Sequence, residues 1–292
     1  MPVANIASVR NSGIEFSLNY NKNIGQIKYS IGANFSTVKN VVEKTSGHIP
    51  IGSIEEGYSM NYIKGYKVGG IFQNQAEVDA WKAKYKDDSY TAEKVAPGDY
   101  YFLDQRSAPT KPGTFYKDSL DNKITGAYDQ VYLGKTIPGY YYGLNINLEY
   151  KNVDFSVQFT GVGDVQKVNA VKQSLYNVGN TSANQSVDVL NAWTPQNHST
   201  TLPRAINGDP AGNNRFSNRF VENGAYCRLS NLQLGYTLPS QVYSFMRNSI
   251  SNCRIYAGAS NLFTITNYTG YDPENDNYPT PRTVFMGLNV RF

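Results

Sequence analysis

The sequence predicts an all-β fold, an antiparallel transmembrane β-barrel segment of about seven strands with long extracellular loops. Three observations support this prediction. Apolar and polar residues alternate along seven segments, some intervals between segments are far longer than others, and the composition is rich in tyrosine and poor in charge. The alternation has a physical reason, because a strand between lipid and a wet interior needs one apolar and one polar face.

The composition favours an interfacial protein over an ordinary soluble one. Charged residues make up 17% of the 292 residues, below the roughly 25% usual in soluble domains. Tyrosine occurs 24 times, and its apolar ring with a polar tip suits a membrane interface. A tyrosine-rich soluble β-protein would have the same composition. The net charge of +4 has no basic cluster behind it, so nucleic-acid binding is not indicated.

The first strands form a predicted hairpin. Apolar side chains occupy every second position from Ile14 to Tyr20 and again from Ile27 to Phe35. The five residues 21–25 are predicted to be the turn between them. No stretch reaches the roughly 18 consecutive apolar residues of a membrane-spanning helix, so a helical membrane protein is excluded.

A second hairpin and three further strands complete the predicted sheet. Leu144 to Tyr150 alternates, Lys151 and Asn152 form a tight turn, and alternation resumes from Val153 to Phe159. The remaining strands are predicted at 232–238, at 255–259 with a weaker pattern, and at 284–292.

The lengths of the connections separate a membrane barrel from a soluble sandwich. The stretches at about 38–138 and 163–224 are too long for loops of a compact soluble domain, but they are ordinary on the outside of a barrel. If the last strand runs inward, the connections at 21–25, 151–152 and about 239–251 lie in the periplasm. The long loops, including 263–282, then lie outside.

The alternation assigns each side chain to a face. The lipid face includes Leu144, Ile146 and Leu148. The strand ends carry aromatic residues that match interfacial girdles, namely Tyr20, Phe35, Tyr140, Tyr141, Tyr142, Tyr150 and Tyr236. The polar lumen is predicted to contain Asn145, Asn147, Glu149, Asp154 and Gln158.

The chain ends on an alternating strand that stops at an aromatic residue. Outer-membrane barrels commonly end in this way, and Gly287, Val290 and Phe292 are predicted to form the signal that the barrel-assembly machinery reads. A C-terminal edge strand of a soluble sheet is the alternative. Stopping within the strand, with no tail, favours the assembly signal.

Several stretches resemble the C-terminal barrel of SusC/RagA-type TonB-linked outer-membrane proteins of Bacteroidetes. Leu-Gly-Lys-Thr-Ile-Pro at 133–138 and Ala-Trp-Thr-Pro at 192–195 are two of them, and a short helical stretch through Glu77 and Trp81 is a third. The matching stretches follow the family's order and cover almost the whole chain, at 9–15, 69–73, 97–99, 133–138, 142–145, 192–195, 217–224, 226–236, 261–266, 270–274 and 278–282.

The resemblance implies that 1–292 is the C-terminal part of a 22-stranded barrel that imports oligosaccharides or peptides. The plug domain, the N-terminal strands, the segment that contacts TonB and any signal peptide would then lie upstream. The implied partners are TonB, a SusD-like surface lipoprotein that acts as a lid, the barrel-assembly machinery and outer-membrane lipid. Neither a cofactor nor nucleic acid is implied.

No catalytic residue or metal ligand is predicted. His48 and His198 lie in long loops without recognisable partners, and Cys227 and Cys253 fit no metal spacing. Family members often carry a calcium-loop-like stretch, but the residues at the corresponding place lack its spacing and are predicted to form a solvated acidic turn. These residues are Asp118, Asp121, Asn122, Ile124 and Asp129.

Loop aromatics are the candidate ligand contacts. Trp81, Tyr90, Tyr116 and Trp193 could stack on a sugar ring, although packing of the loops on themselves is the stronger interpretation. Two other functions remain open at this stage. The first is a soluble carbohydrate-binding β-sandwich module. The second is a polysaccharide-acting enzyme, which would need two carboxylates at hydrolytic separation.

Overall fold

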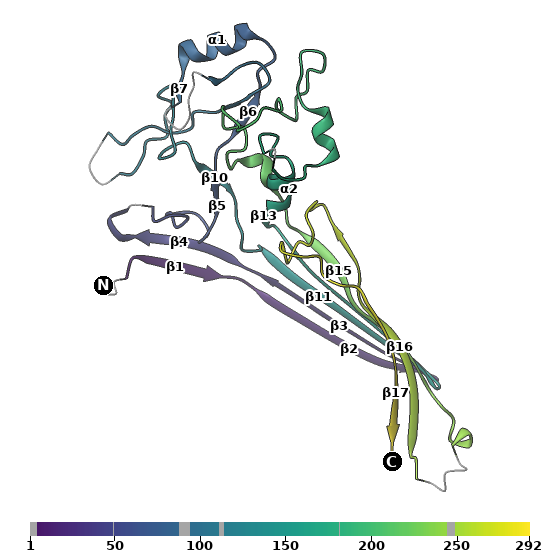
Figure 1. Ribbon diagram of the computed structural model, residues 1–292. Coiled ribbons are helices and arrows are strands. Elements are labelled where there is room, and N and C mark those ends of the chain that lie inside the picture. Colours follow the sequence, from purple (N-terminus) through teal and green to yellow (C-terminus); the bar gives the residue numbers. More distant parts are fainter. Residues whose placement is uncertain (1–4, 49, 88–93, 111–113, 181, 244–248) are drawn as a thin grey trace.

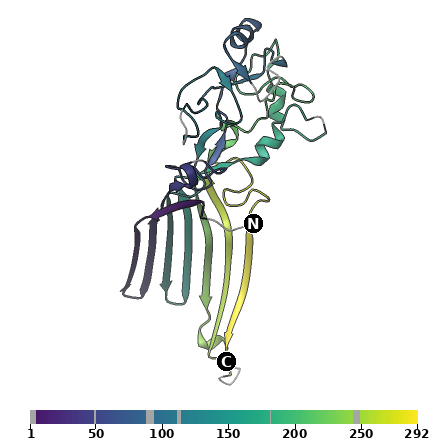
Figure 2. The same ribbon diagram turned by 90° about the vertical axis from the view of Figure 1, so that its left-hand side faces the viewer.

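The fold is seen in a computed structural model that describes residues 5–48, 50–87, 94–110, 114–180, 182–243 and 249–292. A seven-stranded antiparallel sheet dominates it, and apart from η5 Ser240–Val242 the other elements gather beyond one end of that sheet (Figure 1). The sheet is curved and open, with β2 at one edge and β17 at the other (Figure 2). The fold class is therefore as predicted.

The seven strands pair in the order β17-β16-β15-β12-β11-β3-β2. All neighbours are antiparallel, and the long strands are connected as hairpins except where a long loop intervenes. Their bounds are β2 Glu15–Ile24, β3 Ile27–Thr37, β11 Tyr140–Tyr150, β12 Val153–Gly163, β15 Tyr226–Thr237, β16 Asn252–Thr266 and β17 Thr283–Arg291.

The first hairpin turn is tighter than predicted. The strand β2 continues to Ile24, which pairs with Ile27, so the expected five-residue turn at 21–25 is wrong. The turn contains only Gly25 and Gln26, and Gly25 adopts a φ of +58°, which glycine reaches without steric cost. The polar run that resembled a turn pairs instead with β3. The other tight turn, at Lys151 and Asn152, is confirmed.

Most of the strands are longer than their alternation indicated, β11 beginning at Tyr140 and β12 ending at Gly163. The strands β15 and β16 begin or end several residues beyond the predicted 232–238 and 255–259. A β-bulge between Leu229 and Asn231 shifts their register, and Asn261 on the partner strand has a φ of +53°. Because a bulge inserts one residue, it reverses the inward and outward positions and interrupts the period of two.

The connections at the two ends of the sheet are strongly unequal. At the turn end, 25–26, 151–152 and 238–251 join consecutive strands, and the last of these contains η5 Ser240–Val242. At the loop end, 38–139, 164–225 and 267–282 join them. This inequality confirms the predicted pattern of short turns and long loops.

Cys227 and Cys253 lie in β15 and β16 as free thiols.

The long loops contain secondary structure of their own, which we call the loop module. The strand pairs β1–β4, β5–β10, β6–β8, β7–β9 and β13–β14 are each only a few residues long. The elements beyond the sheet are β1 Ala7–Ser12, β4 Lys39–Thr45, η1 Ser46–His48, β5 Ile63–Gly65, β6 Val68–Ile71, α1 Gln75–Lys84, β7 Lys86–Asp87, β8 Tyr100–Phe102, β9 Lys123–Ile124, β10 Val131–Gly134, β13 Gln166–Val168, α2 Ala170–Leu175, η3 Val187–Asn191, η4 Asn218–Phe220 and β14 Val221–Asn223.

The loop module has its own apolar core. Its buried residues come from segments more than a hundred residues apart, so the loops fold onto one another. Helix α1 contributes Val78 and Trp81, and it is capped by Asn74, whose side chain accepts a hydrogen bond from the Glu77 N–H. The rest of the core is Tyr66, Ile71, Phe72, Val95, Tyr100, Phe102, Ile124, Trp193 and Ala211.

Among the described residues, the helices are too short and too polar for any of them to cross a bilayer.

Replacing Ile146 with arginine is expected to impair assembly of the full-length protein. Ile146 lies on the apolar face in the middle of β11, where an arginine at mid-membrane depth costs roughly 2–4 kcal/mol. Asn147→Arg is the matched control, because the next side chain along the strand faces the polar side. The yield of folded barrel in the outer-membrane fraction is the measurement. Equal yields for the two variants would contradict the assignment of the faces.

Candidate binding site on the polar face of the sheet

The register of the sheet separates its side chains into two faces. On the polar face, Asn145 of β11 lies opposite Gln158 of β12 and Gly32 of β3. One position along, Leu144 lies opposite Phe159 and Ala33, which belong to the other face. The division continues across the sheet, although the alternation along β15 and β16 is interrupted at their bulge.

The apolar face is open rather than covered. Met286 of the edge strand β17 is 85% exposed, and β2, β15 and β16 also expose large apolar side chains. Phe35 lies 5.8 Å from Tyr140 between ring centroids, and Tyr140 lies 6.3 Å from Tyr142, so aromatic rings gather at the loop end. A continuous exposed apolar face rimmed by aromatics is suited to contact with lipid.

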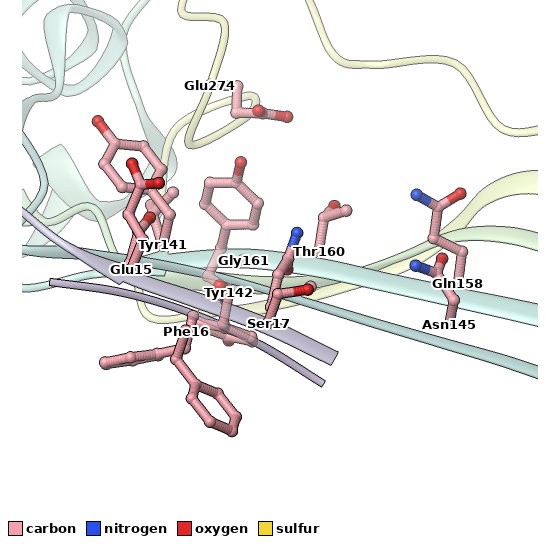
Figure 3. Close-up of a pocket in the computed structure, with 16 residues that line it drawn as sticks. Glu15, Phe16, Ser17, Tyr141, Tyr142, Asn145, Gln158, Thr160, Gly161 and Glu274 are labelled. Carbon is pink, nitrogen blue, oxygen red and sulfur yellow. Dashed lines mark hydrogen bonds between the residues drawn. The ribbon is translucent and has the colours of Figure 1, made fainter. Parts of the chain in front are cut away.

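A cavity of about 910 Å³ lies at the loop end of the polar face. Figure 3 shows Glu15, Thr160 and Gln158 on one side of the strands, with Phe16 on the other. Its lining includes amide groups of Asn145 and Gln158 and the phenol of Tyr141, which can donate and accept hydrogen bonds. The remaining polar side chains of the lining are Ser17, Asn34, Ser36, Tyr142, Tyr226 and Glu274.

The loop between β16 and β17 places Glu274 above this cavity (Figure 3). Arg228 of β15 donates to both carboxylate oxygens of Asp272, at 2.8 and 2.7 Å, and also binds Glu274. The Glu274 N–H donates to Asp272 at 2.8 Å. Lys167 of β13 donates to the Pro273 carbonyl at 2.6 Å, so the loop is held from two strands.

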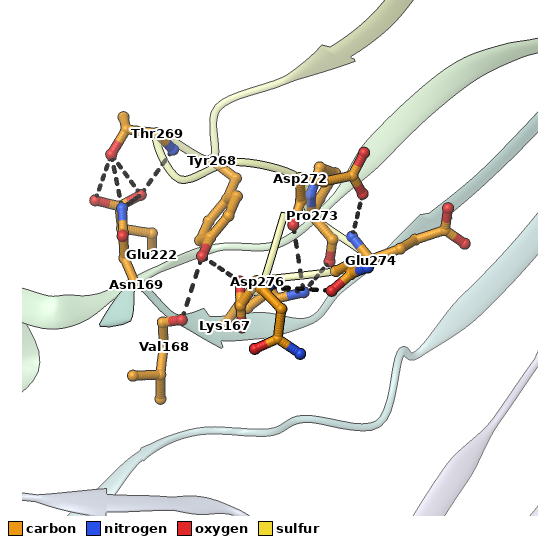
Figure 4. A network of polar contacts seen from close by, with 12 residues as sticks. Lys167, Val168, Asn169, Glu222, Tyr268, Thr269, Asp272, Pro273, Glu274 and Asp276 are labelled. Atoms are coloured by element: carbon orange, nitrogen blue, oxygen red, sulfur yellow. Dashed lines mark hydrogen bonds and ion pairs between the residues drawn. The ribbon is translucent and has the colours of Figure 1, made fainter. Parts of the chain in front are cut away.

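A second group of contacts ties the same loop to the loop module (Figure 4). Glu222 of β14 accepts hydrogen bonds from the Thr269 N–H at 2.8 Å and from Lys172 Nζ at 2.9 Å. Asn169, which is buried, donates to Glu222 at 3.2 Å. Tyr268 donates to the Val168 carbonyl at 3.3 Å and also binds Asp276. These contacts hold the loops 164–225 and 267–282 together.

The two carboxyls at these anchors titrate below their ordinary ranges. Burial alone would raise the pKa of Glu222, but hydrogen bonds from Thr269, Lys172 and Asn169 lower it by more. Burial likewise opposes the shift at Asp272, whose pKa is lowered by hydrogen bonds from Thr280, the Glu274 N–H and Arg228. Both carboxylates therefore favour the folded loop when they are charged.

Acidification is expected to loosen these anchors. A carboxyl with a lowered folded pKa contributes stability that is present above its unfolded pKa, about 3.9 for Asp and 4.3 for Glu, and is lost as the pH falls through the folded value. The thermal midpoint of the full-length protein should therefore drop between pH 6 and pH values below about 4. Glu222→Gln should show a smaller drop. An equal drop in this variant would remove Glu222 from the explanation.

Two of the sequence-predicted ligand contacts lie in the core of the loop module. Trp81 and Trp193 are each 8% exposed, and both belong to the same apolar cluster. The Trp193 ring stacks on His198 at 5.7 Å, and its N–H donates to Gln73 at 3.2 Å. The structure thus gives both tryptophans packing partners within the loops, and their contact with a ligand stays a prediction.

Tyr116 does not belong to this apolar cluster. The Tyr116 hydroxyl donates to Glu55, and the guanidinium of Arg106 lies 3.6 Å from the centre of its ring. Tyr90 lies outside the described residues. Neither Tyr116 nor the tryptophans line the cavity on the polar face.

Sequence reasoning placed Asn145 and Gln158 on the polar face but did not identify the site at its loop end. Glu15 could have been found, because it alternates with apolar neighbours at the start of the first strand. Glu274 could not, because it lies in a long loop where no periodicity relates it to a strand.

The acidic stretch before β10 is only partly as predicted. Asp118, Asp121 and Asn122 are exposed, in agreement with a solvated turn, but Asp129 is fully buried. Its carboxylate accepts hydrogen bonds from the Gln105 and Thr125 N–H groups, both at 2.7 Å, and therefore organises the turn. Within the described ranges, no group of three or more His, Cys, Asp or Glu residues is arranged to hold a metal ion.

Two residues of the predicted assembly signal, Gly287 and Val290, lie on opposite faces of β17, and Phe292 follows the end of the strand. Gly287 pairs with Tyr256, and a Cβ at this position would come within 2.4 Å of the Tyr256 ring, so packing alone accounts for the glycine. Val290 pairs with Cys253 on the apolar face, and Phe292 is exposed at the chain end. Recognition of these residues during assembly stays a prediction.

Comparison with known proteins agrees with this architecture. No protein-family model matches the chain. Over 99% of its length, the chain is 30% identical to TonB-dependent receptor P3 of Formosa agariphila and 25% identical to TonB-dependent receptor SusC of Bacteroides thetaiotaomicron. It covers 29% and 27% of those two proteins, so it spans less than a third of the length of its relatives.

Solved structures share the fold. The chain matches a structure of the RagAB peptide transporter with a TM-score of 0.71 at 21% identity, covering 98% of this chain and 30% of that one. The RagAB peptide importer in its closed-closed state matches with a TM-score of 0.73 at 20% identity, with 98% and 30% covered. The chain is therefore homologous, over its whole length, to the barrel portion of SusC/RagA-type TonB-dependent receptors, which are outer-membrane transport proteins rather than enzymes.

Proposed function

We propose that the chain forms wall and extracellular loops of a TonB-dependent outer-membrane importer of oligosaccharides or peptides. One observation carries this proposal: the sheet has an exposed apolar face, a polar face with a cavity at its loop end, and open edges at β2 and β17. Unpaired strand edges are costly in lipid, so the edges pair with further strands of the same barrel.

The relatives support the rest of the importer. A plug domain and N-terminal strands, contributed by other parts of the protein, complete a barrel of about 22 strands, and TonB releases the plug from the periplasmic side. A SusD-like surface lipoprotein covers the loop module. The RagAB structure is named as a peptide transporter, which supports peptide cargo, and the oligosaccharide class rests on the resemblance of the sequence to SusC/RagA-type proteins.

Two finer assignments belong to the same proposal. Gly287, Val290 and Phe292 form the part of the last strand that the barrel-assembly machinery reads. Cargo that enters through the loop module contacts Trp81, Tyr90, Tyr116 and Trp193, and it reaches the two buried tryptophans when the module opens.

The apolar face, Met286 included, contacts outer-membrane lipid.

The soluble β-sandwich is the alternative that the geometry disfavours. A sandwich buries the apolar face of one sheet against a second sheet. In the part of the chain that the structure describes, that face instead exposes side chains on β2, β15, β16 and β17.

The proposal is tested by uptake in a Bacteroidetes host that carries the full-length receptor in place of its own copy. Depletion of neutral oligosaccharides and of mixed peptides from the medium is followed by mass spectrometry, with and without TonB. Uptake that requires both the receptor and TonB supports the proposal. Uptake that persists without TonB, or a receptor that is absent from the outer-membrane fraction, contradicts it.

A matched pair of variants tests whether cargo passes along the polar face of the sheet. Asn145→Trp fills the cavity on the polar face and should lower uptake by roughly tenfold, an effect of about 1.4 kcal/mol. Ile146→Trp places the same ring on the apolar face and should leave uptake unchanged. If both variants import equally well, the cargo does not pass this wall.

A further inference from the structure

The cavity on the polar face has an unbalanced charge. Two carboxylates, Glu15 and Glu274, belong to its lining, and the described residues contribute no Lys, Arg or His side chain to it. Its other polar groups are amides and hydroxyls, which bind neutral polar groups and carry no charge. The net formal charge of the lining is therefore negative.

Glu15 has no cationic partner in the described part of the chain. It lies on the edge strand β2, is exposed, and forms no ion pair with a described residue. Its neighbours across the strands are Ser36 of β3 and, one strand further, Tyr141 of β11. Neither can neutralise it.

Glu274 forms an ion pair with Arg228, which also pairs with Asp272. Arg228 binds Asp272 through both carboxylate oxygens, and these two side chains are almost completely buried. Because Asp272 balances the charge of Arg228, the Glu274 carboxylate adds a net negative charge although it contacts the same guanidinium. The side chain of Glu274 is 51% exposed, and Figure 3 shows it above the cavity.

The loop that carries Glu274 is built to keep it in place. Lys167 donates to the Pro273 carbonyl and lies 3.5 Å from Asp276, so its charge is engaged by groups of the loop itself (Figure 4). Around this anchor, two cations, Arg228 and Lys167, meet three carboxylates, Asp272, Glu274 and Asp276. The local balance is again negative.

We propose that this cavity selects cargo by charge, accepting neutral or cationic polar ligands and excluding acidic ones. Glu15 and Glu274 are the residues that determine this specificity, and Arg228 positions Glu274. An acidic sugar or peptide in the cavity would lie within a Debye length, about 8 Å, of carboxylates that the walls screen only partly. Uronate, sulfated or aspartate-rich cargo is thereby disfavoured. This inference rests on the proposed import function.

The experiment uses the full-length receptor in its native outer membrane and two matched probe sets. One is a set of oligosaccharides in neutral, amino and uronate forms, and the other is a peptide library with net charges from about −3 to +3. Depletion of each member is quantified by mass spectrometry for the wild type, Glu15→Gln, Glu274→Gln and the double variant. Asp79→Asn on α1 is the control, since it removes one loop carboxylate that does not line the cavity.

The wild type is expected to import neutral or cationic members at least about tenfold faster than acidic ones. Each Gln variant should raise acidic uptake by roughly threefold to tenfold and the double variant by more, with neutral uptake and its TonB dependence retained. The control should keep the wild-type ratio. A double variant that still rejects acidic members, or a wild type that prefers them, overturns the inference while import itself stands. Loss of TonB-dependent uptake of every member contradicts the import function instead.

Discussion

Arg228→Met is expected to destabilise the loop between β16 and β17 by about 3–5 kcal/mol. Arg228 is buried and forms charge-assisted hydrogen bonds with Asp272 through both carboxylate oxygens, as well as binding Glu274 and the Thr264 hydroxyl. Removing one partner of a buried ion pair leaves the other charge uncompensated, and this penalty dominates the cost. We expect 267–282 to detach from the sheet.

Limited proteolysis of the full-length receptor in detergent measures this detachment, with cleavage sites read by mass spectrometry. The double variant Arg228→Met with Asp272→Leu is the informative control, because it removes the uncompensated carboxylate and should recover part of the loss. Protection of 267–282 at wild-type level in the single variant would show that the ion pair does not hold the loop.

Trp81→Ala is expected to destabilise the loop module by a similar amount, about 3–5 kcal/mol, because it deletes a large buried side chain and leaves a cavity. The Trp81 ring contacts Phe72 edge-on at a centroid distance of 5.7 Å and lies 5.9 Å from Tyr85. Trp81→Phe should cost less, since it keeps most of the ring volume. Hydrogen exchange of α1 and of 94–104 in the full-length receptor is the measurement.

The same variant separates packing from ligand contact. If Trp81 acts by packing, exchange in the loop module rises and uptake falls for every cargo together. If Trp81→Ala left exchange unchanged but weakened uptake of one cargo class, the tryptophan would be a ligand contact, as the sequence allowed. The phenylalanine variant should then restore stacking in part.

The strands are the part of this protein that local sequence predicts well. Side chains on a strand alternate with a period of two, so Leu144 and Asn145 had to face opposite sides wherever the strand lay. The errors in the strand bounds also have local causes. The polar residues Asn21, Lys22 and Asn23 suggested a turn, but Gly25 permitted a tighter turn after them. The bulge near Leu229 concealed the start of β15.

The loops required the tertiary structure. The pairs β5–β10 and β6–β8 contain only three or four residues per strand, too few for a period to be recognised, and they are stabilised by a core drawn from distant segments. The sequence showed Trp81 and Trp193 as aromatic residues in loops. Only the structure showed that both tryptophans are buried in the same apolar cluster and so form part of a core.

By itself, the sequence determined the fold class, the faces of the strands, the two ends of the sheet and the kinship with TonB-dependent receptors, because each depends on local alternation or on segment order. The tertiary structure decided where the candidate binding site lies. Glu274 reaches the cavity through contacts between Arg228 and Asp272, which are 44 residues apart, and between Lys167 and Pro273, 106 residues apart. No local period encodes such contacts, since they form only when the loops close over the sheet.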